Sequence, residues 1–348
     1  MKCYICLTDS ISIRKDYLDL LKVTLISARK NTSLKLVCLY DGKTNDAAYK
    51  LLEEYQVEII LHPIPYKQEL MEIYPKEWMN KELGKEIDYN RIFGTFMRME
   101  IPMIEKEEEY VLYTDMDVIF NHDIRLEDLP RPKYLAAAPE FDQDIQKMTA
   151  FNAGILLINI NGVKEKYQDF RTMMLKKQRN SINLFDQGYL NELCFKDMEI
   201  LPNEYNWKPY WGINEEAKII HFHGMKPGCK IEEAGFTTDA SFYRMVFQNN
   251  PTGYAGYIYY FALFYRYLGN ENDQWLYLHL QGLFNLYRTP DFILPLCEDR
   301  INALKEQGEY YKNRYEKYRR KYKLFTRLLW MSAGLLLITV LYTILTSY

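Results

Sequence analysis

The sequence predicts an α/β fold in which a largely parallel sheet is covered by helices on both faces. Three observations support this prediction. Short apolar strand patterns alternate with helical patterns over residues 2–61, which is typical of a parallel sheet with crossover helices. An apolar run at 110–120 is typical of a buried strand, and it carries two carboxylates toward its carboxyl end, where open α/β sheets hold their ligands. Beyond residue 235 the chain becomes aromatic-rich, then basic, then continuously apolar.

The N-terminal elements follow from two periodicities. The strand segments are short, apolar and rich in β-branched or aromatic residues, whereas Leu18, Leu21 and Leu25 recur at helical spacing. The expected order is strand 2–8, helix 17–29, strand 34–40, helix 47–55 and strand 57–61.

The same patterns continue after a charged and aromatic stretch that has no clear period. We expect the last strand of this part, which ends at His221, to close the sheet. The expected elements are helix 91–104, strand 110–120, strands 133–138 and 155–160, helix 175–193 with a break near Ser181, and strand 219–221.

The C-terminal part predicts a membrane anchor. The run from Leu328 to Leu345 is uncharged and mostly apolar, and it is just long enough to span a bilayer as a helix. Trp330 and Tyr342 lie near its ends, as interfacial aromatic residues do. A cluster of Lys and Arg residues between Lys312 and Arg327 precedes it and marks the cytoplasmic side.

The predicted organisation therefore has four parts. Dense Tyr and Phe residues between 254 and 296 predict packed helices, because such a stripe at helical spacing is more often core than binding surface. The parts are a sheet domain at 1–235, a helical aromatic-rich accessory region at 236–299, a basic helical stalk at 300–326 and a transmembrane helix at 327–346.

The net charge and the cysteine spacing bear on the partner and on the cellular compartment that we expect for this chain. A formal net charge of −3 gives no argument for a nucleic-acid partner. The six cysteines show no disulfide spacing, and we interpret them as reduced cytosolic residues. Together with the C-terminal segment, this predicts a single-pass, tail-anchored membrane protein whose N-terminal domain is cytoplasmic, with a bacterial inner membrane as the expected location.

Asp115 and Asp117 are the first candidate functional residues. In an extended strand they project to the same side, where two carboxylates repel each other unless a cation or a shared proton relieves them. Such oxygen ligands suit Mg²⁺ or Mn²⁺ carrying a phosphorylated substrate. A solvated Asp-x-Asp turn remains open for the tripeptide alone.

Further segments, taken with this pair, resemble a known family. They are Thr8-Asp9, Arg98, Asp115-x-Asp117, the segment 151–159 (FNAGILLIN), the segment 185–191 (FDQGYLN) and the segment 220–227 (IHFHGMKP). In this order they resemble glycosyltransferase family 8, which contains retaining sugar transferases such as lipopolysaccharide galactosyl- and glucosyltransferases and the glycogenins. The resemblance covers roughly residues 1–230 and implies a GT-A fold, which is Rossmann-like, and a UDP-sugar donor.

The resemblance implies a metal site. It assigns Asp115, Asp117 and His221 as ligands of Mn²⁺, which bridges the nucleotide diphosphate in the family. An imidazole beside two carboxylates suits Mn²⁺ better than Mg²⁺, although Mg²⁺ remains an alternative. His223 lies two residues further on and is an alternative ligand.

The resemblance also implies residues that bind the donor. Asp9 matches the residue that contacts uracil, with Thr8 beside it, and Arg98 matches a basic residue near the diphosphate and sugar. The remaining matches are Asp115, the small residues Asn152, Ala153 and Gly154 near the donor sugar, and Gly224 and Lys226 of the terminal phosphate-binding motif.

Two departures from the family pattern affect this assignment. Lys226 follows His221 by one residue fewer than usual, and Gly228 replaces a tryptophan. Ser10-Ile11 stands where many members carry an asparagine–tyrosine pair that stacks on the base.

Asp186 and Gln187 match the pair beside the anomeric carbon. The resemblance assigns them to transition-state stabilisation and donor positioning, because an oxocarbenium-like centre needs nearby negative charge or a dipole. A covalent glycosyl-enzyme and front-face attack both remain open. An N-cap role is the structural alternative for Asp186.

The sequence thus predicts a metal-dependent retaining transferase that moves a hexose, most simply glucose or galactose, from a UDP-sugar to a glycan or lipid-linked acceptor. Surface polysaccharide or lipopolysaccharide assembly is the expected setting. The alternatives are a membrane-tethered inactive scaffold of the same fold and a phosphatase of the haloacid dehalogenase type, although that pattern requires threonine or valine where Ile119 stands.

Overall fold

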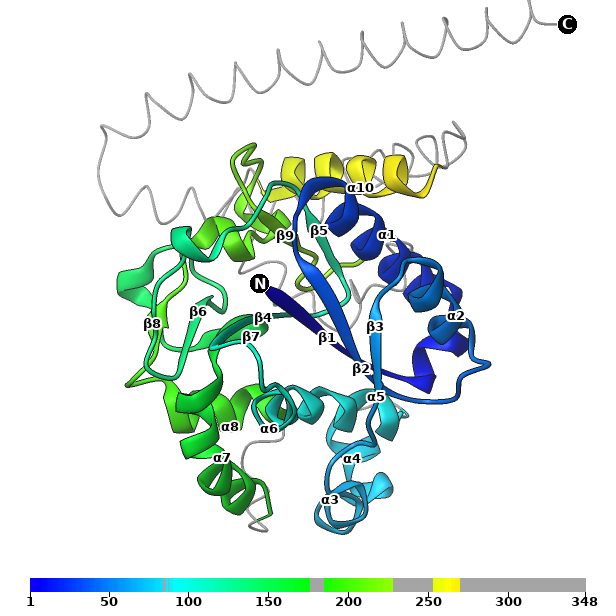
Figure 1. Ribbon diagram of the computed structural model, residues 1–348, viewed down its shortest axis with the longest axis vertical. Coiled ribbons are helices and arrows are strands. Elements are labelled where there is room, and N and C mark those ends of the chain that lie inside the picture. Colours follow the sequence, from blue (N-terminus) through cyan, green and yellow to red (C-terminus); the bar gives the residue numbers. More distant parts are fainter. Residues whose placement is uncertain (84–85, 87, 176–184, 228–252, 270–348) are drawn as a thin grey trace, which may run out of the picture. The chain divides into compact units, whose positions relative to one another are not determined.

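The computed structural model describes residues 1–83, 86, 88–175, 185–227 and 253–269, all within one compact unit that spans Met1–Leu276 (Figure 1). Its centre is a seven-stranded sheet with the strand order β3-β2-β1-β4-β7-β6-β8, and β5 pairs with β9 in a separate two-stranded sheet. The strands are β1 Lys2–Thr8, β2 Lys35–Asp41, β3 Glu58–Leu61, β4 Tyr110–Thr114, β5 Val118–Phe120, β6 Leu135–Pro139, β7 Phe151–Asn159, β8 Glu199–Ile200 and β9 Ile219–His221.

The prediction of a largely parallel α/β sheet is confirmed. The strands β3, β2, β1 and β4 pair in parallel, and so do β6 and β8. The exception is β7, which runs antiparallel to both of its neighbours, β4 and β6. The sequence predicted a strand at 155–160 but not the direction in which it runs relative to its neighbours. The strand β7 also begins earlier than predicted, at Phe151.

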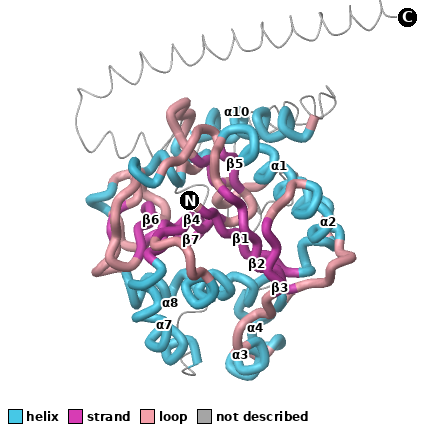
Figure 2. The backbone as a smooth tube through the Cα atoms, in the orientation of Figure 1, coloured by secondary structure: helices cyan, strands magenta, loops and turns pink. Residues whose placement is uncertain are grey.

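Helices cover both faces of this sheet, as Figure 2 shows. One face packs against α1, α2 and α10, and the other packs against α3 to α8. The helices are α1 Lys15–Asn31, α2 Ala47–Glu54, α3 Lys67–Ile73, α4 Lys76–Leu83, α5 Tyr89–Phe93, α6 Ile101–Ile104, α7 Ile160–Leu175, α8 Phe185–Cys194 and α10 Gly253–Leu268.

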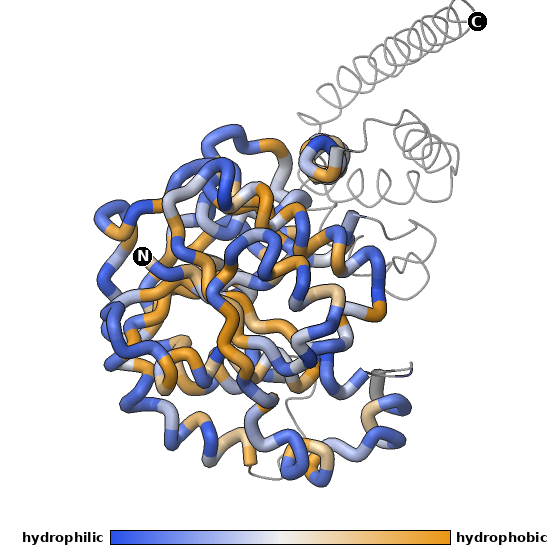
Figure 3. Tube along the Cα trace, turned by 45° about the vertical axis from the view of Figure 1, so that its right-hand side comes forward, coloured by the Kyte–Doolittle hydropathy of each residue, from blue (hydrophilic) through white to orange (hydrophobic). Residues whose placement is uncertain are grey.

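The apolar runs of the central strands follow from this double coverage. Leu112 of β4 lies in the core shared with α1, whereas Val111 and Tyr113 lie in the core on the opposite face. Because successive side chains of a strand point to opposite faces, a strand buried on both sides is apolar at every position. Figure 3 shows the hydrophobic colour concentrated along these inner strands.

The predicted single strand at 110–120 is wrong. The strand β4 ends at Thr114, the chain bends over Asp115–Asp117, and β5 then pairs with β9 instead of the main sheet. Helix α1 explains the break: the hydroxyl oxygen of Thr24 lies 2.6 Å from the carbonyl oxygen of Met116 and accepts a hydrogen bond from the backbone N–H of Val118. The expectation that the His221 strand closes the main sheet is wrong for the same reason.

One helix prediction also needs correction. The predicted helix 91–104 is split into α5, the 3₁₀ helix η2 Gly94–Glu100, and α6. Of the predicted helix 175–193, residues 176–184 lie outside the described residues and α8 covers most of the rest. Helix α7 was not predicted, although its buried Val163, Phe170 and Met174 have helical spacing.

Helix α10 packs onto the sheet domain through its aromatic residues, as the sequence predicted. Tyr257, Tyr260 and Phe261 are buried in the core on the α1 face, and the hydroxyl of Tyr267 accepts a hydrogen bond from Asn31. Residues 270–348, which include the predicted stalk and transmembrane helix, lie outside the described residues. Within the described ranges, no helix has the length and apolar character needed to cross a membrane.

Candidate functional site

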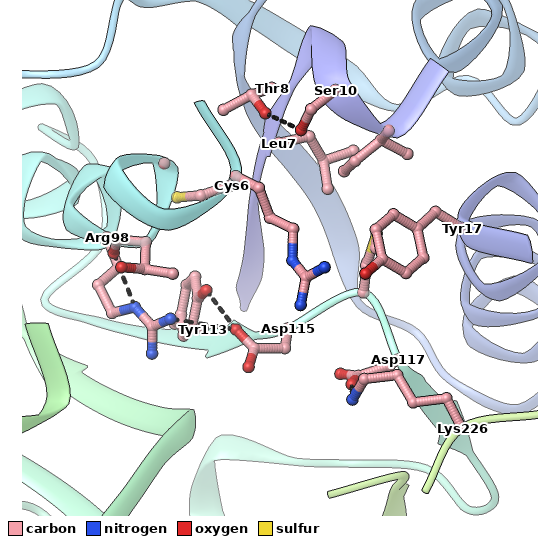
Figure 4. A pocket seen from close by; sticks show the side chains of 15 residues that line it. Cys6, Leu7, Thr8, Ser10, Tyr17, Arg98, Tyr113, Asp115, Asp117 and Lys226 are labelled. Atoms are coloured by element: carbon pink, nitrogen blue, oxygen red, sulfur yellow. Dashed lines mark hydrogen bonds and ion pairs between the residues drawn. The ribbon is translucent and has the colours of Figure 1, made fainter. Parts of the chain in front are cut away.

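Two neighbouring cavities open beside the bend at Asp115–Asp117. The first has a volume of about 210 Å³ and lies between the end of β1, helix α1 and the α5–η2 segment (Figure 4). The second has a volume of about 250 Å³ and reaches β7 and α8. Both cavities are lined by Arg98, Asp115, Asp117 and Lys226. Charged side chains therefore lie where the two cavities meet.

Asp115, Asp117 and His221 form a group that could hold a metal ion, since one ligand atom from each lies within 4.8 Å of the others. Asp117 and His221 are buried, and Asp117 Oδ1 lies 3.5 Å from His221 Nε2. That carboxylate oxygen has no hydrogen-bond partner. A buried anionic oxygen without a partner is costly unless a cation compensates it, so this donor set fits a divalent ion.

Charge near Asp117 keeps its carboxylate ionised. Burial raises the pKa of Asp117, an effect that the ammonium group of Lys226 opposes, and the pKa lies well below its usual range. An ionised carboxylate is the form that binds metal.

Gly154 leaves the space that this group needs. A Cβ atom at residue 154 would lie 2.3 Å from Cε1 of His221 and 2.9 Å from Oδ2 of Asp115. The backbone carbonyl of Gly154 also accepts a hydrogen bond from the N–H of Asp115. The sequence associated this glycine with close approach of a sugar, whereas the structure shows that it leaves room for the side chains of His221 and Asp115.

The guanidinium of Arg98 forms ion pairs with two carboxylates, those of Asp115 and Asp186. Its guanidinium lies 3.2 Å from Asp115 and 2.9 Å from Asp186, and it donates to the backbone carbonyl of Ala153. It also stacks over the ring of Tyr113, whose hydroxyl donates to Asp115. Burial lowers the pKa of Arg98, but Asp186, Tyr113 and Asp115 more than compensate. The arginine is therefore a fixed cation at the centre of the site.

Asp186 and Gln187 lie in the first turn of α8 and line the second cavity. Burial raises the pKa of Asp186, an effect that Arg98 opposes. The side-chain oxygen of Gln187 accepts a hydrogen bond from the backbone N–H of Ala153. Gln187 thus holds the start of β7 in place, a contact that the sequence did not indicate.

Lys226 points into the site despite its shifted spacing. Its ammonium group contacts the carboxylate of Asp117, and it donates to the backbone carbonyl of Phe222. Gly224 has a φ of 88°, a conformation that glycine adopts without strain and that turns the chain between His223 and Lys226.

Two predicted residues are engaged with protein groups. Thr8 lines the first cavity and shares a hydrogen bond with Ser10, whereas Asp9 accepts one from Asn90 of α5.

His223, the alternative metal ligand, does not join the described metal group. Its ring lies 3.2 Å from Glu140 and 2.8 Å from the Tyr210 hydroxyl. The strand β9 ends at His221, so the alternation that would have aligned the two histidines is lost.

Arg91 is a site residue that the sequence reasoning missed. It lines the first cavity, stacks over the ring of Tyr17, and pairs with no carboxylate among the described residues. Arg91, Gly94 and Arg98 all line this cavity, at the i, i+3 and i+7 positions of one helical face. That spacing was a signal within the predicted helix 91–104, but only the fold shows that this face of the segment lines a cavity.

Comparison with known proteins identifies the family. Residues 10–230, well over half of the chain, match glycosyl transferase family 8. The chain belongs to this family. Its GT-A-like α/β fold agrees with the one that the motif resemblance implied, and the family assignment replaces the phosphatase alternative.

The curated relatives are distant and longer. Glucoside xylosyltransferase 1 of Gallus gallus is 26% identical over 210 residues, which cover 49% of this chain and 46% of the relative. A putative glycosyltransferase of Haemophilus influenzae is 26% identical over 212 residues, covering 56% of this chain and 61% of the relative. The chain thus spans about half the length of the curated relatives it matches.

A solved structure is also similar. The glycosyltransferase GlyE of Streptococcus pneumoniae is 22% identical, with a TM-score of 0.43 over 66% of this chain and 57% of that chain.

Proposed function

We propose that this protein is a metal-dependent retaining glycosyltransferase that moves a hexose from a UDP-sugar to a glycan or lipid-linked acceptor. The observation that carries the proposal is the meeting of Asp115, Asp117 and His221 beside Gly154, in a family 8 chain, where two cavities adjoin. Two carboxylates and an imidazole suit a divalent cation that also binds a diphosphate.

The three ligands would hold Mn²⁺ in preference to Mg²⁺, because imidazole is the softer donor. Such an ion supplies Lewis-acid stabilisation to the departing diphosphate. The chain's own cations add to this: Lys226 and Arg91 line the first cavity, and both are able to donate to phosphate or nucleoside oxygens.

The second cavity would hold the hexose. Arg98 forms an ion pair with Asp186 and another with Asp115, and these pairs would hold the two carboxylates in place beside the sugar. Asp186 supplies negative charge beside the sugar, where an oxocarbenium-like centre gains positive charge. Gln187 supports this arrangement by holding the backbone of Ala153.

The test is calorimetric titration of UDP into the full-length protein, with and without Mn²⁺, on the wild type and on Asp117→Ala. We expect Mn²⁺-dependent binding that the substitution abolishes. Binding that is equally tight without metal would show that the assignment of the three ligands is wrong. A wild type that binds no UDP under either condition would favour an inactive scaffold.

We further propose that the acceptor is membrane-borne, in surface polysaccharide or lipopolysaccharide assembly on the cytoplasmic leaflet. The basis is the apolar segment 328–345 and the basic cluster before it. Removing residues 312–348 should then leave UDP-sugar hydrolysis unchanged and reduce transfer to an acceptor carried in vesicles. Equal transfer by the two proteins would contradict this proposal.

A further inference from the structure

We propose that Asn206 is a positioning residue that presents the Nε2 lone pair of His221 to the metal, through a relay of amide side chains that starts at the backbone of Gly154. No motif of the sequence includes Asn206. The inference rests on the proposed metal-dependent function, and it concerns how the histidine ligand is prepared for that role.

The relay starts at a group whose direction is certain. A backbone N–H can only donate, and the N–H of Gly154 lies 3.1 Å from the side-chain oxygen of Asn152. This contact identifies Oδ1 of Asn152 as the atom on that side. The other end of the same amide agrees, since Nδ2 of Asn152 lies 2.8 Å from a carboxylate oxygen of Glu140.

Asn152 in turn orients Asn206. Oδ1 of Asn152 also lies 3.0 Å from the Asn206 amide, so that end of Asn206 must be the nitrogen that donates. The remaining end of Asn206 is therefore its oxygen, which lies 3.0 Å from Nδ1 of His221. An amide oxygen can only accept, so Nδ1 of His221 carries a proton.

The proton at Nδ1 determines what the other side of the ring offers. A neutral imidazole carries one proton, and Nε2 is then an acceptor with a free lone pair. Nε2 is the atom that faces Asp117, at 3.5 Å from its Oδ1, and that oxygen receives no hydrogen bond. A lone pair directed at a carboxylate is repulsive until a cation lies between them. The ring is thus held in the tautomer that binds metal through Nε2.

Backbone pairing places Asn206 beside the ring. Asn206 ends the 3₁₀ helix η6 Asn203–Asn206, and the next residue, Trp207, bridges to β9. The N–H of Trp207 donates to Ile219, and the N–H of His221 donates to Trp207. Asn206 is fully buried and Asn152 is 3% exposed. Both amides are therefore shielded from water, which would otherwise compete for these hydrogen bonds.

Two substitutions separate positioning from folding. Asn206→Leu keeps the branched heavy-atom shape of the side chain and leaves Oδ1 of Asn152 with its hydrogen bond from the N–H of Gly154, but it removes the acceptor from Nδ1 of His221. We expect Mn²⁺ affinity to fall by roughly 10–100-fold, as is usual when the partner of a ligand histidine is removed. Asn206→Asp keeps an acceptor for Nδ1 but sets its second carboxylate oxygen against Oδ1 of Asn152 without a donor, so its Mn²⁺ affinity should lie above that of Asn206→Leu. Asn203→Leu, on the same short helix, is the matched control and should leave the affinity unchanged.

The direct readout is long-range ¹⁵N–¹H NMR of full-length, metal-free protein with labelled histidine, at about pH 8, where an ordinary imidazole is neutral. The chain has five histidines, so a His221→Gln spectrum assigns the signals. We expect the Nδ1–H form in the wild type and in Asn206→Asp, and a mixture of both tautomers in Asn206→Leu.

An Nε2–H or doubly protonated ring in the wild type would overturn the proposal. So would an unchanged tautomer and Mn²⁺ affinity in Asn206→Leu. These failures differ from failure of the proposed function, which would appear as a wild type that binds neither Mn²⁺ nor UDP while its ring still shows the Nδ1–H signature.

Discussion

Gly154 of β7 lies directly against the ring of His221 of β9. A Cβ atom on residue 154 would lie 2.3 Å from Cε1 of the histidine. The two residues lie in different sheets, and the ring of His221 occupies the space that a side chain at residue 154 would need. A contact this short has no room for a methyl group, because packed interiors do not yield by more than a few tenths of an ångström without cost.

Gly154→Ala should therefore displace His221 and abolish Mn²⁺-dependent UDP binding, measured by calorimetry. The matched control is Gly162→Ala in helix α7, where the added Cβ would lie 1.8 Å from the carbonyl oxygen of Lys133 and would meet the backbone of Lys133 and Tyr134 instead of the metal group. That control should lower the melting temperature and leave Mn²⁺ affinity of the folded protein unchanged. Normal metal binding by Gly154→Ala would contradict the site geometry.

Arg98→Met should destabilise the fold because it leaves Asp186 buried without its cation. Breaking a buried ion pair from one side costs about 3–5 kcal/mol, measurable by urea unfolding. Adding Asp186→Asn to the same protein should recover part of this loss. Arg125→Met is the control, since its pair with Asp123 is exposed and should change stability by less than about 1 kcal/mol. Equal effects of the two arginine substitutions would refute the buried-pair interpretation.

Lys226→Met should change metal binding and nucleotide binding in opposite directions. The ammonium group contacts the carboxylate of Asp117, so removing it should strengthen binding of Mn²⁺ alone, by about tenfold or about 1.4 kcal/mol. If Lys226 also binds diphosphate, UDP affinity at saturating Mn²⁺ should fall. Both affinities can be measured by titration calorimetry. A fall in Mn²⁺ affinity would mean that the lysine supports the metal group instead of competing with the ion.

Arg91→Met should weaken UDP binding by roughly 10–100-fold, the scale of one or two hydrogen bonds to a charged group. The guanidinium lines the first cavity without a carboxylate partner in the described part of the chain, so its charge is available to a ligand. The salt dependence of UDP binding should become shallower in the variant, because one cation fewer attracts the anion. Arg125→Met again serves as the control, and an identical UDP affinity in the two proteins would exclude Arg91 from the donor site.

Glu105 should make stability depend on acid pH. Burial raises the pKa of Glu105, but hydrogen bonds from Tyr4, Lys2 and backbone N–H groups outweigh it and lower the pKa from its ordinary 4.5 to about 2. Because the folded pKa lies below the unfolded one, this group stabilises the fold fully above pH 4.5 and loses its contribution as the pH falls toward 2.

Glu105→Gln tests this dependence by urea unfolding. The free energy difference from wild type should be about 2–3 kcal/mol at neutral pH, as for charged hydrogen bonds, and should shrink progressively at acid pH. Glu53→Gln, on the exposed side of α2, should show no such trend. A constant difference at every pH would mean that the ionised carboxylate is not what stabilises the fold.

The sequence by itself determined the elements whose patterns are local. Strands β1 to β3 and helices α1 and α2 were predicted because apolar periodicity depends only on neighbouring residues. The site residues Asp115, Asp117, His221 and Lys226 were found through motifs of fixed order. Helix α7 had the same kind of signal in Val163, Phe170 and Met174, and it could have been predicted in the same way.

Only the tertiary structure decided how these pieces meet. The run at 110–120 is uniformly apolar, and it divides into two strands because Thr24 of α1, distant in sequence, bonds to the backbone around Val118. Asn206 reaches His221 only through the bridge between Trp207 and Ile220. Such contacts join segments that are far apart along the chain, and no local period records them. The candidate ligands could therefore be predicted from the sequence, whereas the hydrogen bonds that orient them required the fold.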